Sequence, residues 1–306
     1  MTSRPTMILA TLATVLVACG GEPEKGTDTA QQPHLVIGGE DAQATASSHY
    51  QMPTPNELFA IVREMAGEGQ KRMMNPAVNA DRYVSLPARA LNFGVYSTDL
   101  VYASYFKLNV EVVRYYLAVK KLGDKVGIAS AFSDNDFVRL EANLTRGNND
   151  SLEILSNDAY YKAYLKLQEE DMGPTLALVL AGGWVESMHL VMRQVVTFDP
   201  QSPLISRVAD QKVSLEHLLD LMEQHKADPN IVTWRNKLIA IRDQFDRLDI
   251  KRVPHSGKSA SGRMVLGDDV VVSLTSEQYD QISKAVEQLR DEIIRTEDQA
   301  SIKPNA

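Results

Sequence analysis

Cysteine is almost absent from this chain of 306 residues, in which Cys19 is the only one. A single cysteine excludes a disulfide within the chain and any zinc site built on several cysteines. Aromatic residues make up 7% of the sequence. The one strongly apolar stretch beyond the N-terminus, at residues 174–185, is predicted to be too short for a bilayer-spanning helix, which needs about 20 residues.

The motifs that usually identify nucleotide-binding and hydrolytic enzymes are also missing. The sequence contains neither a Gly-x-x-x-x-Gly-Lys-Ser/Thr loop nor a Gly-x-Ser-x-Gly elbow. Glu186 and His189 form one Glu-x-x-His pair, but a di-iron bundle needs two such pairs and two further glutamates. The sequence therefore predicts no cofactor and no metal centre.

The charge balance is acidic, with a formal net charge of −8 that becomes −9 without residues 1–18, whose only charged residue is Arg4. This excess disfavours nucleic acid and anionic lipid surfaces as partners. The 44% hydrophobic and 24% charged composition is typical of a globular protein long enough to bury one sizeable core.

The N-terminus has the pattern of a secretory signal. Arg4 provides the positive region, residues 7–18 are largely apolar, and the small Ala18 precedes Cys19. The tetrapeptide at residues 16–19, Leu-Val-Ala-Cys, resembles the lipobox of bacterial lipoproteins. The resemblance implies that Cys19 is lipidated and becomes the mature N-terminus, which anchors the protein to the bilayer. An ordinary secretory signal ending near a free cysteine is the alternative.

Composition divides the chain into five segments. Residues 1–18 are the predicted lipoprotein signal peptide, and residues 19–54 form a lipidated N-terminus with a Gly-, Pro- and Thr-rich tether whose expected span is roughly 30 Å. A helical bundle is predicted at residues 55–255. A linker with a possible short strand follows at residues 256–275, and a C-terminal helix at residues 276–297.

Apolar residues recur at spacings of three and four through most of the bundle. They predict one helix of roughly 50 Å from Pro87 to Lys121 and another from Pro229, behind the capping residue Asp228. The predicted fold is all-α, a multi-helix bundle of long antiparallel helices. The seam of the first long helix is predicted to contain Tyr96, Ala103, Phe106, Val110, Val113 and Leu117.

Three local patterns refine this fold. The uncharged residues 174–185 predict the central helix of the bundle, and the adjacent Gly182 and Gly183 indicate that another backbone approaches closely. Ser214 is predicted to begin a helix. Thr275 is predicted to cap the C-terminal helix, and the run of three valines at residues 270–272 to form the one short strand.

Polar residues interrupt the predicted seam. Asn92 and Asp99 occupy positions where the seven-residue spacing calls for apolar side chains. A buried carboxylate without a partner costs several kcal/mol, so Asp99 should meet a donor or line a cavity. The predicted donors are arginine side chains or tyrosine side chains such as Tyr96 and Tyr102.

A second polar row, formed by Glu186, His189 and Arg193, lies on the predicted central helix. Together with Asn92, Tyr96 and Asp99 these residues are the candidate site, either a buried structural network or a ligand site. A closed pair of carboxyl groups satisfied by donors favours the network, whereas a solvent-open pocket between Asp99 and Glu186 favours a hydrolase or small-ligand binder.

Three longer segments, at residues 92–100, 139–141 and 181–186, are similar to segments of helical outer-membrane lipoproteins of Gram-negative bacteria. The resemblance implies a helical fold and a lipid-anchored place in the outer membrane, on its periplasmic face or at the cell surface. It carries no activity. The expected function is therefore a non-enzymatic binding or scaffolding domain with an envelope protein as its partner; the alternative is the hydrolase or ligand binder that uses Asp99 and Glu186.

Overall fold

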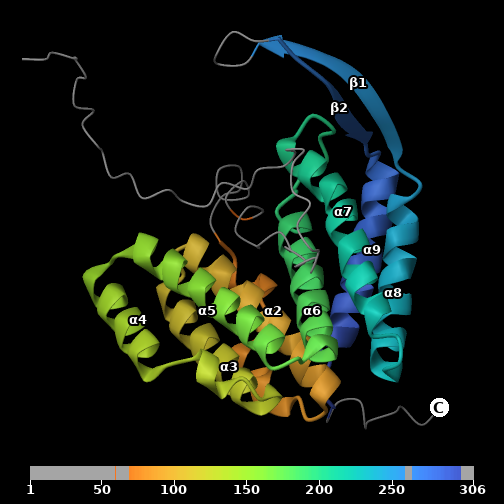
Figure 1. Ribbon diagram of the computed structural model, residues 1–306. Coiled ribbons are helices and arrows are strands. Elements are labelled where there is room, and N and C mark those ends of the chain that lie inside the picture. The colour runs from red at the N-terminus through yellow and green to blue at the C-terminus, as the bar shows by residue number, and fades with distance from the viewer. Residues whose placement is uncertain (1–58, 60–68, 259–263, 298–306) are drawn as a thin grey trace, which may run out of the picture. The chain divides into compact units, whose positions relative to one another are not determined.

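The computed structural model describes residue 59 and residues 69–258 and 264–297 (Figure 1). The predicted signal peptide, Cys19 and the predicted tether lie outside the described residues, as does most of the helix predicted to begin at residue 55. The one described residue of that region, Phe59, is helical and fully buried.

The described residues form eight α-helices, three short 3-10 helices and one two-stranded sheet, so the predicted all-α multi-helix bundle is confirmed. The α-helices are α2 (Leu86–Tyr105), α3 (Asn109–Val126), α4 (Asp134–Arg146), α5 (Asn149–Glu169), α6 (Gly173–Met192), α7 (Pro203–Gln224), α8 (Pro229–Phe245) and α9 (Ser276–Ile293). The 3-10 helices are η1 (Lys71–Met73), η2 (Ala77–Arg82) and η3 (Ala129–Ala131). The strands are β1 (Asp249–Lys258) and β2 (Met264–Ser273).

The prediction of one long helix from Pro87 to Lys121 is wrong, because the chain turns between α2 and α3. Lys107 adopts the left-handed conformation, with φ of 57°, and the N–H of Leu108 donates to the carbonyl of Ala103 at 2.8 Å. This arrangement closes the C-terminus of α2. The two helices then pack against each other as a hairpin.

The turn also separates the residues of the predicted seam. Tyr96 and Ala103 on α2 are buried, but Val110 and Leu117 on α3 are 63% and 47% exposed. A seven-residue repeat keeps its residues on one face only while the helix is continuous. After the turn, the same spacing follows the outer face of α3.

The predicted central helix is α6, which contacts α2 and α5 and also α7, α8 and α9. At 20 residues and a mean hydropathy of 1.4, α6 is long and apolar enough to cross a membrane, contrary to the length expected from sequence. Its most apolar window is nevertheless 100% buried inside the protein. Burial by neighbouring helices on every side explains why this helix presents no polar face to solvent; its polar residues Glu186 and His189 are themselves buried.

Close backbone contact explains Gly182 of α6, as predicted, whereas a Cβ on Gly183 would make only ordinary contacts, the nearest at 3.4 Å from Thr98. A Cβ atom on Gly182 would lie 1.9 Å from the carbonyl oxygen of Leu91 in α2. A Cβ on Gly94 of α2 would lie equally close, at 1.9 Å, to the carbonyl oxygen of Val179. Only glycine allows α2 and α6 to approach this closely.

Capping residues mark several helix starts. Asp228 caps α8 and Thr275 caps α9 through a capping box with Gln278, as predicted. The helix start predicted at Ser214 is wrong, because α7 begins eleven residues earlier, behind the capping residue Ser202.

The region predicted as a linker with one short strand forms an antiparallel hairpin. The register runs from the pair Asp249–Ser273 at the base to the pair Lys258–Met264 near the tip. Valines 270–272 lie in β2 as predicted, but β1 extends over residues assigned to the bundle and the linker. Pairing with β2 satisfies the backbone groups along one edge of β1, which a single strand beside helices would leave unpaired.

Candidate functional site

Two carboxyl groups meet in the interior where α2 packs on α6. Asp99 and Glu186 are both fully buried. The hydroxyl of Thr98 donates to the carbonyl of Gly183 at 3.3 Å, which ties the two helices together next to the carboxyl groups.

This environment favours the protonated form of Asp99. Burial, together with the negative charge of Glu186, raises the pKa of Asp99 well above its usual value of 3.8. Its Oδ2 accepts a hydrogen bond from the backbone N–H of Asn75 at 3.0 Å. Its Oδ1 faces no donor, and a proton on this carboxyl group can be donated to the carboxylate of Glu186.

Arg290 of α9 compensates the charge of Glu186. Its Nε donates to Oε2 of Glu186 at 2.6 Å and its Nη2 donates to Oε1 at 2.8 Å, a bidentate pair. The same Nη2 donates to the carbonyl of Met73 at 3.0 Å. The pair is enclosed, since the side chain of Arg290 is only 8% exposed.

His189 continues the cluster toward the surface. Its Nδ1 lies 2.7 Å from Oε1 of Glu287 and its Nε2 lies 3.0 Å from the carbonyl oxygen of Met73. Both ring nitrogens therefore face acceptors, an arrangement that suits the doubly protonated ring. Arg193 donates to the same Glu287 oxygen at 3.2 Å and is more than half exposed. Although burial opposes it, His189 lowers the pKa of Glu287.

Residues 70–83, here called the strap, close the cluster. The carbonyl of Asn75 accepts a hydrogen bond from Tyr115 of α3 at 2.7 Å, and the carbonyl of Pro76 accepts one from Tyr96 at 2.9 Å. The side chain of Asn75 donates to Asn92 at 3.3 Å and to Tyr83 at 3.0 Å. The strap consists of the 3-10 helices η1 and η2 and the residues that flank them, and side chains from the surrounding helices bond to its backbone carbonyls.

The structure brings the predicted site residues into one network, but their partners differ from those expected. Asn92, Tyr96, Asp99, Glu186 and His189 all lie in the buried part, with Arg193 at its rim. Tyr96 and Tyr102 do not donate to Asp99; they bond to the strap, Tyr96 at the carbonyl of Pro76 and Tyr102 at the sulfur of Met73.

Three partners were missed from the sequence. Arg290 could have been found, because it occupies the apolar face of the predicted C-terminal helix four residues after Val286. Nothing in the sequence around Glu287 or Asn75 indicates that either residue contacts the buried carboxyl cluster. Asn75 lies outside every predicted stripe, and its role depends on a backbone N–H that any residue except proline carries.

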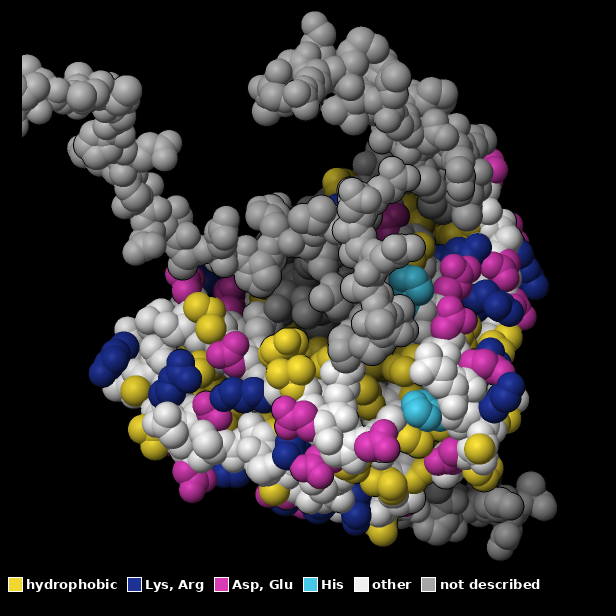
Figure 2. All heavy atoms as spheres, viewed as in Figure 1, with side chains coloured by type: hydrophobic (Ala, Val, Ile, Leu, Met, Phe, Trp, Pro, Cys, Tyr) yellow, Lys and Arg dark blue, Asp and Glu magenta, His cyan; other side chains and the backbone are white. Residues whose placement is uncertain are grey.

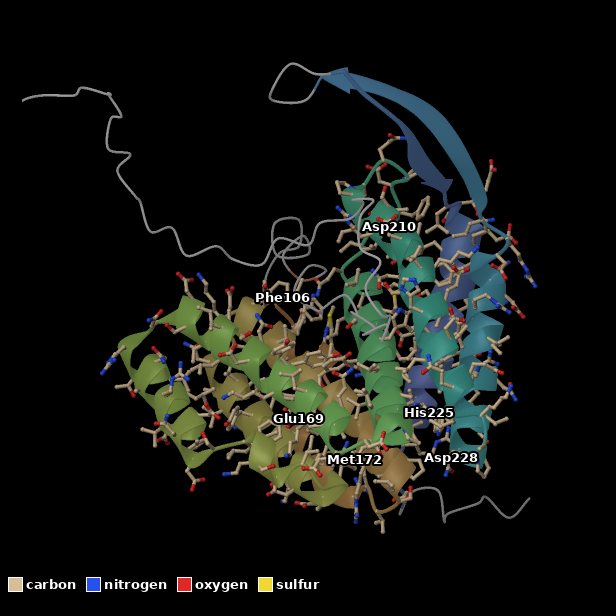
Figure 3. All side chains as sticks on the ribbon, in the orientation of Figure 1. Phe106, Glu169, Met172, Asp210, His225 and Asp228 are labelled. Carbon is tan, nitrogen blue, oxygen red and sulfur yellow. The ribbon has the colours of Figure 1, made fainter. Side chains whose placement is uncertain are left out.

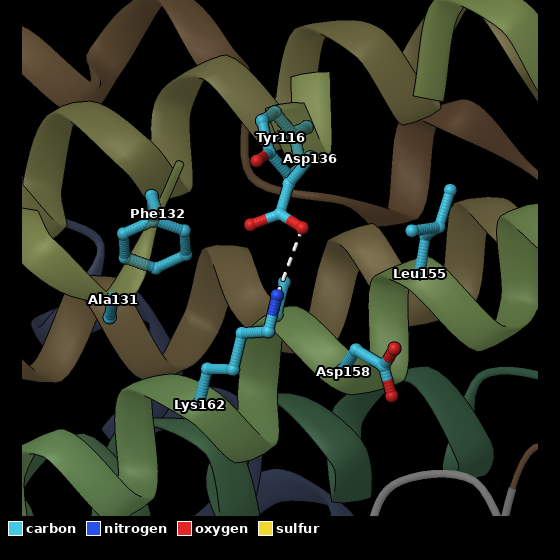
Figure 4. Close-up of a pocket in the computed structure, with 8 residues that line it drawn as sticks. Tyr116, Ala131, Phe132, Asp136, Leu155, Asp158 and Lys162 are labelled. Carbon is cyan, nitrogen blue, oxygen red and sulfur yellow. Dashed lines mark hydrogen bonds and ion pairs between the residues drawn. The ribbon is translucent and has the colours of Figure 1, made fainter. Parts of the chain in front are cut away.

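A second acidic cluster lies between α3, α4 and α5, next to a cavity of about 10 Å³ (Figure 4). Such a volume holds roughly one water molecule. Asp136 accepts hydrogen bonds from Lys162 at 2.9 Å and from the hydroxyl of Ser133 at 2.8 Å. The buried hydroxyl of Tyr116, which also lines the cavity, has no hydrogen-bond partner among the described residues. Within the described part of the chain, no group of His, Cys, Asp and Glu is placed to hold a metal ion.

Comparison with known proteins does not add an identity to this geometry. No protein-family model, curated protein or solved structure matches the chain. Any functional inference therefore depends on the sequence pattern and on the contacts described above.

Proposed function

We propose that this chain is a lipid-anchored, non-enzymatic protein of the outer membrane whose helical bundle acts as a binding or scaffolding domain. The lipobox-like residues that end at Cys19 support the anchor. The closed state of the carboxyl pair supports the non-enzymatic role, and it is the observation on which the proposal depends.

The carboxyl pair is closed to a substrate from outside the bundle. Asp99 and Glu186 are both 0% exposed, and the strap and Arg290 occupy the positions from which a substrate would approach. A general acid or base must come within hydrogen-bonding distance of the reacting group. A substrate could reach these carboxyl groups only after displacement of the strap, which is held by hydrogen bonds from several helices. The hydrolase alternative is therefore the weaker one.

The surface is compatible with a soluble domain on a tether. Basic and acidic side chains are interspersed on the face shown in Figure 2. Such a mixed surface keeps a domain soluble and leaves its association with partners to particular patches.

Replacement of Cys19 tests the anchor. In cells fed radioactive fatty acid, Cys19→Ala should lose the label and move from the membrane fraction to the soluble fraction, because acyl chains provide the stable attachment. Thr27→Ala, in the predicted tether, is the matched control and should keep both label and fractionation. Retention of the label in Cys19→Ala would contradict lipidation at this residue.

Cross-linking in intact membranes tests the binding role. The tagged, anchored chain should yield one reproducible cross-linked protein that is also captured by Asp99→Asn, since the amide keeps the acceptor for Asn75 and the folded surface is unchanged. The scaffolding role would be wrong if a folded Asp99→Asn chain lost the partner, or if the anchored chain gave no specific cross-linked product. Either result would favour the alternative, in which the carboxyl pair is a ligand site.

A further inference from the structure

The outer face of α3 carries a row of alternating apolar and basic residues. Val110, Arg114, Leu117 and Lys121, here called the α3 stripe, follow each other at spacings of four, three and four. They therefore share one face of the helix. All four are exposed: Val110 by 63%, Leu117 by 47%, and the side chains of Arg114 and Lys121 by 53% and 49%. No element of the described chain covers them.

The stripe is locally positive on an acidic protein. Glu111 forms ion pairs with both Lys71 and Arg114, at 2.6 and 2.9 Å. Asp81 on η2 forms ion pairs with both Lys121 and Lys125, at 2.5 and 3.2 Å. Four cations thus surround two carboxylates, whereas the whole chain has a net charge of −8. The net charge disfavours an anionic partner for the protein as a whole, so this face is the local exception.

The continuous described segment begins at Gly69, beside the N-terminal end of the stripe. Gly69 lies against Phe106, the residue that follows α2 and is labelled in Figure 3, since a Cβ on Gly69 would be 2.3 Å from that of Phe106. Two residues later, Lys71 pairs with Glu111 in the first turn of α3. Gly69 therefore lies next to this face. Phe59, farther toward Cys19, packs on Tyr102 and Tyr105 of α2, and the predicted tether of residues 19–54 has an expected span of roughly 30 Å.

We propose that the α3 stripe rests on the phospholipid headgroups of the leaflet that holds the acyl chains of Cys19. This inference depends on the proposed lipid anchor. Apolar side chains alternating with Lys and Arg suit the headgroup region, because the long basic side chains reach the phosphates while the apolar ones enter the acyl boundary. Two apolar residues bind a bilayer weakly, so the contact orients the anchored domain and does not replace the anchor. A protein partner is less favoured, because the narrow stripe has no aromatic residue to anchor an interface.

Depth-dependent fluorescence quenching tests this orientation. The full lipidated chain, purified from membranes, is reconstituted into vesicles of phosphatidylethanolamine and phosphatidylglycerol at about three to one, with or without brominated acyl chains. Leu117→Trp should show at least a twofold loss of the added fluorescence with bromolipid. Val213→Trp on α7, at a residue that is 56% exposed, is the control and should show no loss.

Charge reversal tests the electrostatic part. In the Leu117→Trp background, reversal of Arg114 and Lys121 to Glu should abolish the quenching. Reversal of Arg207 and Lys226 to Glu changes the net charge equally, at side chains that are 54% and 70% exposed, and should leave it intact. Three outcomes would overturn the proposal: equal quenching at residues 117 and 213, no quenching at residue 117 in these vesicles, which contain no other protein, or quenching that persists after the reversal of Arg114 and Lys121.

Flotation of the same vesicles separates this inference from the proposed anchor. If the chain with intact Cys19 does not float with the vesicles, the anchor itself is wrong, and the orientation of the stripe is overturned with it. If the chain floats and the quenching is not selective, only the α3 stripe inference fails. Quenching that appears only in native membranes would assign the stripe to a protein partner.

Discussion

Asp99 and Asp136 place the same functional group in two regions with opposite results. Asp99, where α2 packs on α6, has one backbone donor and a second carboxyl group beside it, so its pKa is raised. Asp136, at the start of α4, is also largely buried, and burial acts to raise its pKa. Its bonds to Lys162 and Ser133 outweigh burial and lower the pKa. The pKa of a buried carboxyl group therefore depends on the number of donors that reach it as well as on its burial.

Gly182 on α6 and Gly147 at the end of α4 are also required for different reasons. Gly182 is required because the backbone of another helix occupies the place of a side chain. Gly147, which ends α4, has φ of 67° and no atom within 4 Å of a Cβ placed on it. The first glycine serves a contact between distant segments, and the second serves a local turn.

The largest effect is expected from removal of Arg290, the cation that pairs with the buried Glu186. Arg290→Met should destabilise the domain by about 3–5 kcal/mol, because Glu186 would be left buried without a countercharge. Arg139→Met, which removes an exposed cation 3.8 Å from Asp136, should cost less than about 1 kcal/mol. Urea unfolding of the two variants without residues 1–19 measures both values. Similar losses would contradict the difference drawn between the two regions.

The glycine comparison should give an intermediate effect. Gly182→Ala places a methyl group on the backbone of Leu91 and should cost about 3 kcal/mol, the upper part of the usual range for overpacking. Gly147→Ala meets no atom but must keep a left-handed conformation, at a cost of about 1 kcal/mol. Thermal melts compare the two. If Gly147→Ala were the more damaging variant, the close helix contact would be refuted.

The two carboxyl groups should give stability profiles of opposite slope. Because the folded pKa of Asp99 is raised, the folded state holds the proton more tightly, and stability falls as the pH rises from about 4 toward that folded pKa, by at most about 1.4 kcal/mol per pH unit. Because the folded pKa of Asp136 is lowered, its contribution is present above about pH 4 and is lost as the pH falls through the folded pKa.

Single substitutions separate these two slopes. Asp99→Asn should flatten the decline above pH 4, and Asp136→Asn should reduce the loss on the acid side; denaturant midpoints measured from pH 3 to pH 9 report both. An unchanged profile in Asp99→Asn would show that Asp99 is ionised in the folded protein.

The smallest effect is expected at Tyr116. Its buried hydroxyl has no hydrogen-bond partner among the described residues, so Tyr116→Phe should change stability by no more than about 0.5 kcal/mol. The adjacent Tyr115 donates to the carbonyl of Asn75 at 2.7 Å, and Tyr115→Phe should cost about 1–3 kcal/mol. Calorimetric melting of both variants tests the contrast, and a larger loss at Tyr116 would place a bound water in the adjacent cavity.

Several features were determined by the sequence alone, because their causes are local. Side-chain periodicity predicts the helices, and side-chain hydrogen bonds to nearby N–H groups predict the caps at Asp228 and Thr275. The uncharged residues 174–185 predict a fully buried helix, and Gly182 predicts a close contact, since both properties depend on the residues themselves.

Other features were decided by the tertiary structure. The turn at Lys107 interrupts a seven-residue pattern that continues in the sequence, so the pattern alone could not show where α2 ends. Arg290 and Glu186 are 104 residues apart, and Asn75 reaches Asp99 through a backbone N–H that leaves no trace in the sequence. Local patterns show which side chains must be buried. Which groups meet once buried depends on how the helices cross, because that geometry is a property of the whole packed core.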